Sequence, residues 1–265
     1  MKRVLQAWYG LSGRAGLLLV LGGCANGLTE QQRLWLARGQ DYYEHEDYTR
    51  AIDQLSRFLG EVREGPGVAR ALFVRGMSNA QAGHRAPAYA DLRRCAATPA
   101  DDEITWRAYL VLGTLHFEDR QWAQAAQKLR ATAERMPTGP PKDTVLYRLG
   151  LCHERTGRWR AAAQFYSEIT KSFSGGKYAR AAYRRLRLNA NHFAVQCGAF
   201  RGKNNAETLR DNLEGKGLRA YVRQEIGGRR PLYVVLVGRF ADYDEALAQL
   251  AMIKRQFVPD AVLWP

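Results

Sequence analysis

The sequence has no uninterrupted apolar stretch of the ~20 residues that a helix needs to cross a bilayer. It also lacks the G-x-S-x-G, H-E-x-x-H and phosphate-binding-loop motifs that mark three large classes of enzyme. We therefore expect neither a membrane-spanning helix nor a catalytic site, and we expect that the chain is not an enzyme.

Acidic residues are under-represented: 26 Asp and Glu stand against 40 Lys and Arg, which gives a net charge of +14. Such a balance is typical of proteins that contact nucleic acids, acidic polymers or membrane surfaces. The excess is spread along the chain, however, with 11 Lys and Arg against 8 Asp and Glu in residues 191–265. No basic run interleaved with aromatic residues occurs, so we expect no nucleic-acid partner.

Cysteine is also scarce, with four in the chain. Cys24 follows an apolar stretch near the amino terminus, and the other three are Cys95, Cys152 and Cys197. An odd number with apolar neighbours favours small buried side chains over a disulfide framework. Cys152 is followed by His153, but no second pair of ligands lies at metal spacing. We therefore expect no metal site and no cofactor.

Residues 1–23 are typical of a secretion signal, because basic residues precede a short apolar run over 15–21. Two glycines then lead into Cys24, and the sequence Leu-Gly-Gly-Cys resembles the lipobox of bacterial lipoproteins. The alternative is an ordinary signal peptide that happens to contain a cysteine.

The lipobox resemblance implies that Cys24 is lipidated and becomes the mature amino terminus, with residues 24–29 as a short tether. Several acyl chains on one residue anchor a protein stably, whereas a single chain binds only reversibly. By the sorting habit of this class, Ala25 in place of aspartate implies an outer-membrane protein that faces the periplasm.

Residues 30–190 contain four units with a period of 37 residues. Three columns of side chains keep this step: a glycine column (Gly39, Gly76, Gly113, Gly150), a small column (Ala51, Ala88, Ala125, Ala162) and a bulky column (Leu55, Leu92, Leu129, Tyr166). A glycine inside a helix costs about 1 kcal/mol against alanine, so its return in every unit indicates close helix packing. We expect each unit to be a helical hairpin that shares its core with its neighbours.

These columns resemble the tetratricopeptide repeat, and the segment KYARAAYRRLRLN after them is typical of a terminal capping helix. The resemblance implies that the first helix of each unit lines a groove for a protein or peptide partner. The side chains that we expect in this groove are Leu36, Tyr43, Phe73, Met77, Leu110, Phe117, Tyr147 and Leu151. In the alternative, these side chains pack into the array's own core.

After the repeats the apolar pattern changes from helical to alternating. The expected elements are a strand at 193–200, a helix at 205–217, strands at 218–224 and 233–237, a helix at 242–257 and a last edge strand at 262–263. The order strand–helix–strand–strand–helix–strand is that of a ferredoxin-like half-barrel, with both helices on one face of the sheet.

This order, together with the segments FAVQCGAF and YVVLVGRF, resembles the SPOR domain over residues 191–265. The expected fold class is therefore α + (α+β), a TPR-like helical solenoid followed by a small ferredoxin- or RNP-like SPOR domain. SPOR domains bind peptidoglycan and prefer glycan strands stripped of their stem peptides, so the resemblance implies peptidoglycan as a partner.

The resemblance also implies a glycan site on the sheet face that the two helices leave open. Aromatic rings suit the apolar face of a sugar, and amide or guanidinium groups suit its hydroxyls. Val234 and Leu236 are expected on this face too, which lowers its hydrogen-bonding capacity. The expected glycan-binding residues are Gln196, Ala199, Phe200, Tyr221, Arg223, Leu236 and Arg239. The alternative for Gln196 is an exposed strand residue that solvates the sheet.

The sequence as a whole predicts an outer-membrane lipoprotein that binds peptidoglycan and recruits a protein partner, in cell-wall remodelling or division. Two alternatives remain open. In the first, the chain is an adaptor for envelope protein assembly, and its carboxyl-terminal domain contacts protein through Val234 and Leu236. In the second, the chain is a structural linker between membrane and wall, and the groove is self-packed.

Overall fold

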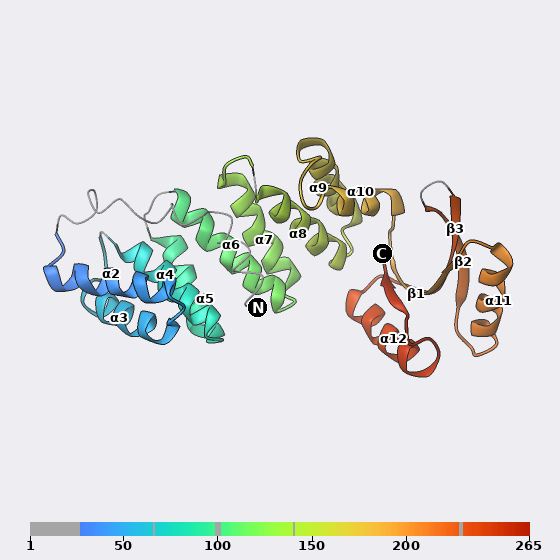
Figure 1. Cartoon of the computed structure of the whole chain (residues 1–265), viewed down its shortest axis with the longest axis horizontal. Coiled ribbons are helices and arrows are strands. Elements are labelled where there is room, and N and C mark those ends of the chain that lie inside the picture. Colours follow the sequence, from blue (N-terminus) through green and yellow to red (C-terminus); the bar gives the residue numbers. More distant parts are fainter. Residues whose placement is uncertain (1–26, 66, 99–101, 140, 228–229) are drawn as a thin grey trace. The chain divides into compact units, whose positions relative to one another are not determined.

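The computed structural model describes residues 27–65, 67–98, 102–139, 141–227 and 230–265 (Figure 1). The expected signal segment 1–23 and lipid-bearing Cys24 lie outside these residues. The helices that precede the sheet are α2 (Glu30–Glu44), α3 (Tyr48–Glu61), α4 (Val68–Gln81), α5 (Arg85–Ala97), α6 (Asp102–Glu118), α7 (Trp122–Arg135), α8 (Lys142–Arg155), α9 (Trp159–Ser172) and α10 (Ala179–Leu188).

The chain divides into two compact units between Val145 and Leu146. This division falls inside α8, so the second unit contains α9, α10 and the sheet in addition to most of α8. The domain boundaries expected from the sequence, with the helical repeats ending near residue 190, stay a prediction.

Each repeat is a helical hairpin whose turn contains a residue in the left-handed backbone region. These residues recur at one position of the repeat: Glu46 (φ 61°), Gly83 (φ 85°), Arg120 (φ 59°) and Gly157 (φ 70°). Glycine adopts this conformation without strain, whereas in other residues the Cβ atom makes it sterically unfavourable. Two repeats thus use glycine at the turn, and two use a charged residue there.

The glycine column forms the closest approach between the two helices of each hairpin. A Cβ added to Gly39 would lie 2.5 Å from the Leu55 side chain, and one added to Gly76 would lie 2.8 Å from Leu92. The same holds for Gly113 against Leu129 at 2.8 Å, and a Cβ at Gly150 would lie 2.3 Å from the Tyr166 ring. The close helix packing predicted at the glycine column is confirmed, and the structure places the bulky column against these glycines inside each hairpin.

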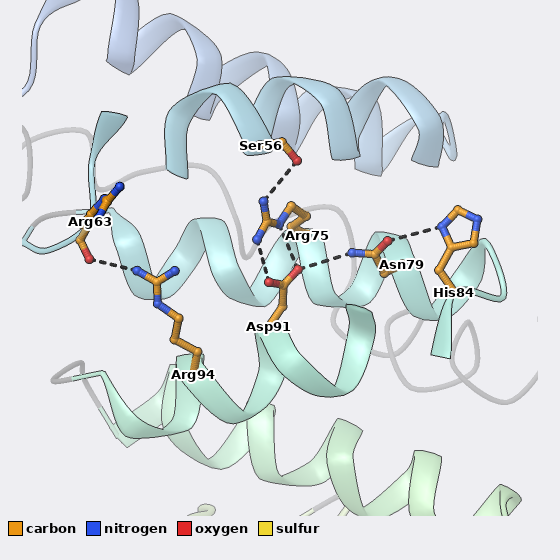
Figure 2. Close-up of polar contacts among 7 residues, drawn as sticks. All are labelled: Ser56, Arg63, Arg75, Asn79, His84, Asp91 and Arg94. Carbon is orange, nitrogen blue, oxygen red and sulfur yellow. Dashed lines mark hydrogen bonds and ion pairs between the residues drawn. The ribbon is translucent and has the colours of Figure 1, made fainter. Parts of the chain in front are cut away.

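A polar network joins three helices in the first half of the array (Figure 2). Arg75 of α4 donates two hydrogen bonds to the carboxylate of Asp91 in α5, at 2.9 and 2.7 Å, and one to Ser56 of α3 at 3.1 Å. Asn79 donates to the same carboxylate at 3.3 Å and contacts His84 in the turn. Bidentate Arg–carboxylate pairs fix geometry as well as charge, so this network sets the register of α3, α4 and α5.

The carboxyl-terminal elements are β1 (Phe193–Phe200), α11 (Lys203–Glu214), β2 (Ala220–Gly227), β3 (Arg230–Phe240), α12 (Tyr243–Gln256) and β4 (Val262–Trp264). The strands form an antiparallel sheet in the order β2-β3-β1-β4. The expected element order and the last edge strand are confirmed. β3 is longer than the expected 233–237, because it pairs with β2 along its first part and with β1 along its last.

One face of the sheet is covered by α11 and α12, as expected from the sequence. Its core consists of small and medium apolar side chains: Val195, Cys197, Ala206, Leu213, Ala220, Val235, Val237, Ile253 and Ala261. We call this the helix face. The opposite face has a different cover, which is described with the site.

Candidate functional site

Gln196 lies in the middle of β1, opposite Leu236 of β3 on one side and Val262 of β4 on the other. Its neighbours Val195 and Cys197 are buried in the core of the helix face. Since successive side chains of a strand alternate, Gln196 points to the opposite face, where it is half-buried.

Tyr221 and Arg223 of β2 lie on the same face as Gln196, since their register partners on β3 are Leu236 and Val234. The Tyr221 hydroxyl lies 2.9 Å from Nε2 of His192, and an Arg223 N–H donates to the carbonyl oxygen of Leu188. Arg239 is exposed at the rim, with its guanidinium 5.9 Å from the centre of the Tyr221 ring. The structure therefore brings Gln196, Tyr221, Arg223 and Arg239 together.

This face is not open, because the segment between α10 and β1 covers it. We call residues 188–192 the connector, and the surface beneath them the connector face. Leu188 and Ala190 of the connector pack, together with Tyr221, against a buried cluster of Ala194, Val234, Leu236 and Trp264. Val234 is 3% exposed and Leu236 is 0% exposed. The expectation that these two side chains are exposed is wrong, and Leu236 is not an exposed glycan contact.

Phe200 is the second correction among the expected glycan residues. A register shift between Gln196 and Gly198 places Phe200 opposite Tyr233, and its ring packs against the core of the helix face. A bulge of this kind interrupts the simple alternation from which its orientation was inferred. Ala199, opposite Val234, stays exposed near the connector face.

Two residues of the connector face were missed by sequence reasoning. Trp264 of β4 is 3% exposed, and its indole N–H donates to the Glu225 carboxylate at 2.9 Å. The Arg223 guanidinium lies 4.7 Å from the centre of one of its rings, and the His192 ring lies 5.4 Å away. The signal for Trp264 was present, because it follows Val262 at the two-residue spacing of a strand. His192 carried no comparable signal.

Burial lowers the pKa of His192, and the nearby charges of Arg239 and Arg223 lower it further. Burial also raises the pKa of Tyr221. His192 is therefore neutral at neutral pH, which suits its short contact with the Tyr221 hydroxyl.

A separate cleft of about 610 Å³ lies between α11 and the edge strand β2. Lys203, Glu207, Arg210 and Glu214 line it from the helix, and the Lys203 ammonium lies 3.2 Å from the Glu207 carboxylate. Two basic and two acidic groups leave this lining without net charge, so it is less suited to an anionic polymer than the connector face.

The residues expected in a partner groove are mostly half-buried. Met77 is an exception, since it is 0% exposed and belongs to the array core, so its expected place in the groove is wrong. Leu36, Tyr43 and Phe73 pack against the neighbouring core cluster. Tyr147 and Leu151 lie in the second compact unit, where the Tyr147 ring stacks on Tyr178 at 4.6 Å. The remaining groove residues Leu110 and Phe117 are half-buried, and their partner role stays a prediction.

The three cysteines Cys95, Cys152 and Cys197 are buried, as expected. Burial raises the pKa of Cys95 and of Cys152 to about 12 and that of Cys197 to about 11, so all three are thiols at neutral pH. Within the described part of the chain, no three His, Cys, Asp or Glu side chains are grouped to hold a metal ion. None of the helices described is long and apolar enough to cross a membrane.

Comparison with known proteins finds two families. The tetratricopeptide repeat model matches residues 36–102 and 110–177, and the SPOR domain model matches residues 189–264. No curated protein matches significantly.

Solved structures share the fold at low sequence identity. One described as MamA protein is 16% identical, with 90% of this chain and all of that chain covered and a TM-score of 0.50. A second MamA structure, AMB-1, is 17% identical, with 60% of this chain and 80% of that chain covered and a TM-score of 0.50.

Proposed function

The chain belongs to the tetratricopeptide repeat family and ends in a SPOR domain, and from this premise we propose that it binds the glycan strands of peptidoglycan while its helical array recruits a protein partner. Both families are binding modules, which supports a role without catalysis. The SPOR match over residues 189–264 carries the glycan half of the proposal.

The chemistry of the connector face supports the same conclusion. Tyr221 and Trp264 present aromatic rings, and Gln196, Arg223 and Arg239 present amide and guanidinium groups. A sugar needs both kinds of contact, because its ring face is apolar while its edge carries hydroxyl and amide groups. The buried core of the helix face consists of apolar side chains and offers no such combination.

We test the proposal by cosedimentation of the whole chain with purified sacculi, before and after an amidase removes the stem peptides. Gln196→Ala should lower the affinity about tenfold, since one lost hydrogen-bonding group is worth about 1.4 kcal/mol. The matched control is Gln224→Ala, because Gln224 is an exposed glutamine of β2 opposite Tyr233 and away from the connector face.

The result would support the proposal if amidase treatment increases binding and only the Gln196 variant loses it. A folded chain that binds neither kind of sacculus would overturn it. The alternative would then be an adaptor for envelope protein assembly, although the burial of Val234 and Leu236 counts against a protein contact through these two side chains.

We further propose that the chain is an outer-membrane lipoprotein, anchored through acylated Cys24 and active in cell-wall remodelling or division. The support is the Leu-Gly-Gly-Cys sequence, which lies outside the described residues. Cys24→Ser should release the protein from the membrane fraction and abolish labelling by a radioactive fatty acid. Labelling that persists in this variant would contradict the anchor.

A further inference from the structure

The connector face has the composition of a binding site but is covered by the chain itself. A face that served only as a core would be apolar where it is buried, as the core of the helix face is. Here Tyr221 and Arg223 form hydrogen bonds with the connector, and Arg223 also lies over Trp264.

The connector makes few apolar contacts with the sheet face that it covers. Leu188 and Ala190 supply apolar contacts from the connector, and both are half-buried; the His192 ring also lies 5.4 Å from the Trp264 ring. The other contacts are polar: Arg223 with the Leu188 carbonyl, and His192 with the Tyr221 hydroxyl and with the Arg239 guanidinium at 3.4 Å. Polar contacts of this kind can be exchanged for contacts with water or sugar hydroxyls at small net cost.

The connector is held in place from its amino-terminal side. Arg185 of α10 donates to the Glu154 carboxylate of α8 at 2.8 Å and to the Pro265 carbonyl oxygen at 2.9 Å. Asn189, directly after α10, adopts a left-handed conformation (φ 43°) that turns the chain at the start of the connector. Asparagine tolerates this conformation better than most residues.

We propose that the connector and a glycan strand compete for the same sheet face, so that residues 188–192 act as a built-in competitor which glycan must displace. The proposal rests on the proposed glycan binding. Displacement exposes the rings of Tyr221 and Trp264 and releases the Arg223 guanidinium from the Leu188 carbonyl oxygen, so that this guanidinium, 3.7 Å from the Glu225 carboxylate, can donate to sugar hydroxyls or N-acetyl carbonyls. The apparent affinity of the chain is then lower than that of the bare face, by the fraction of molecules in which the connector is displaced.

The test measures the binding of a fluorescent denuded glycan oligosaccharide to the whole chain. Leu188→Ala weakens the connector without removing any group of the connector face. It should tighten binding about fivefold, which corresponds to a loss of about 1 kcal/mol in connector packing. The matched control is Tyr183→Ala on the same helix, because Tyr183 is 57% exposed and should leave the affinity unchanged.

A second measurement on the unaltered chain keeps the test independent of any folding defect. Glycan binding should raise hydrogen exchange at the backbone amides of residues 190–192, because the connector leaves the face. Lower or unchanged exchange at these amides on binding would overturn the competition.

The outcomes separate the two proposals. Equal affinities in the unaltered chain and the Leu188 variant would overturn the competition and leave glycan binding intact. No binding by either protein, both folded, would overturn glycan binding and the competition with it.

Discussion

Two interfaces of the molecule are packed in different ways. One lies between the two helices of each hairpin, and we call it the glycine seam; the other lies between the connector and the sheet. In the hairpins, a glycine faces a large side chain that is at most 2% exposed, and the side-chain atoms nearest to the glycine are carbon atoms. Beneath the connector, the half-buried Leu188 and Ala190 and the His192 ring lie over a face that holds Tyr221, Arg223 and Trp264. Opening the first exposes apolar surface without compensation, whereas opening the second lets polar groups find new partners. We therefore expect the interface inside the hairpins to stay closed, and the interface beneath the connector to open at a lower cost in free energy.

The largest expected effect on stability distinguishes two neighbouring residues of β3. One packs beneath the helices α11 and α12, and the other packs beneath the connector. Val235 is 0% exposed in the helix face, and Val234 is 3% exposed beneath the connector. Val235→Asp leaves an unpaired carboxylate among apolar side chains and should destabilise the domain by more than about 3 kcal/mol. Val234→Asp places its carboxylate opposite Arg223 and should displace mainly the connector. Hydrogen exchange along β1 and β3 distinguishes global from local opening, and equal global loss in both variants would contradict the comparison.

The next effect concerns the glycine seam. Gly113→Ala would place a Cβ 2.8 Å from the Leu129 side chain and 3.2 Å from its backbone nitrogen, so the helices must separate. Overpacking of this kind costs about 1–3 kcal/mol. The matched control is Gly60→Ala in α3, which meets nothing within 4 Å and should be neutral or stabilising. Thermal unfolding followed by circular dichroism checks both, and a stable Gly113 variant would show that the seam is not tight.

The connector should open at a lower cost in free energy than the core of the helix face or the core of the helical array. Leu188→Ala removes part of a half-buried side chain and should cost about 1 kcal/mol locally, less than the 2–5 kcal/mol of a fully buried leucine. Hydrogen exchange at residues 190–192 should rise about fivefold while the helix face keeps its protection. Loss of protection at Val235 or Val237 in this variant would mean that the two faces open together.

A substitution in the turn of a hairpin should increase the stability of the array by a smaller amount. Arg120 adopts a left-handed conformation that glycine occupies in the equivalent turn at Gly157. Arg120→Gly should therefore stabilise the array by about 0.5–1 kcal/mol, provided that relief of strain exceeds the added freedom of the unfolded chain. Denaturation in urea measures the change, and Gly157→Ala should shift it in the opposite direction.

The smallest effect is the pH dependence of the connector. The folded pKa of His192 is lowered, so the unfolded or displaced state binds the proton more readily. The stability from neutral His192 is present above pH 6.5, its ordinary value, and is lost as the pH falls through the lowered folded pKa. After correction for the intrinsic rate of amide exchange, which slows as the pH falls, the opening of residues 190–192 should increase at pH 5, and His192→Asn should remove this increase. The pKa of His116 is also lowered, but His116 is present in both the unaltered chain and the His192→Asn variant. Its contribution therefore cancels when the two pH profiles are subtracted.

The repeats were predictable because their interactions are local and recur. Gly39 and Leu55, for example, belong to one hairpin, and their counterparts appear at the same spacing in three further units. The strands, and the face that Gln196, Tyr221 and Arg223 share, followed from the alternation of side chains. Phe200 did not follow it, because a register shift near Gly198 turns the strand.

Local pattern thus determined the hairpins, the close packing at the glycine column, the order of elements along the chain and which side chains share a face, because period and alternation are properties of neighbouring residues. Tertiary structure alone decided that Val234 and Leu236 are buried, that Met77 lies in the core and that Trp264 and His192 join Tyr221 and Arg223. The reason is physical: whether a face meets water depends on which segment lies over it. For the connector face, that segment is only five residues long and carries no periodic signal.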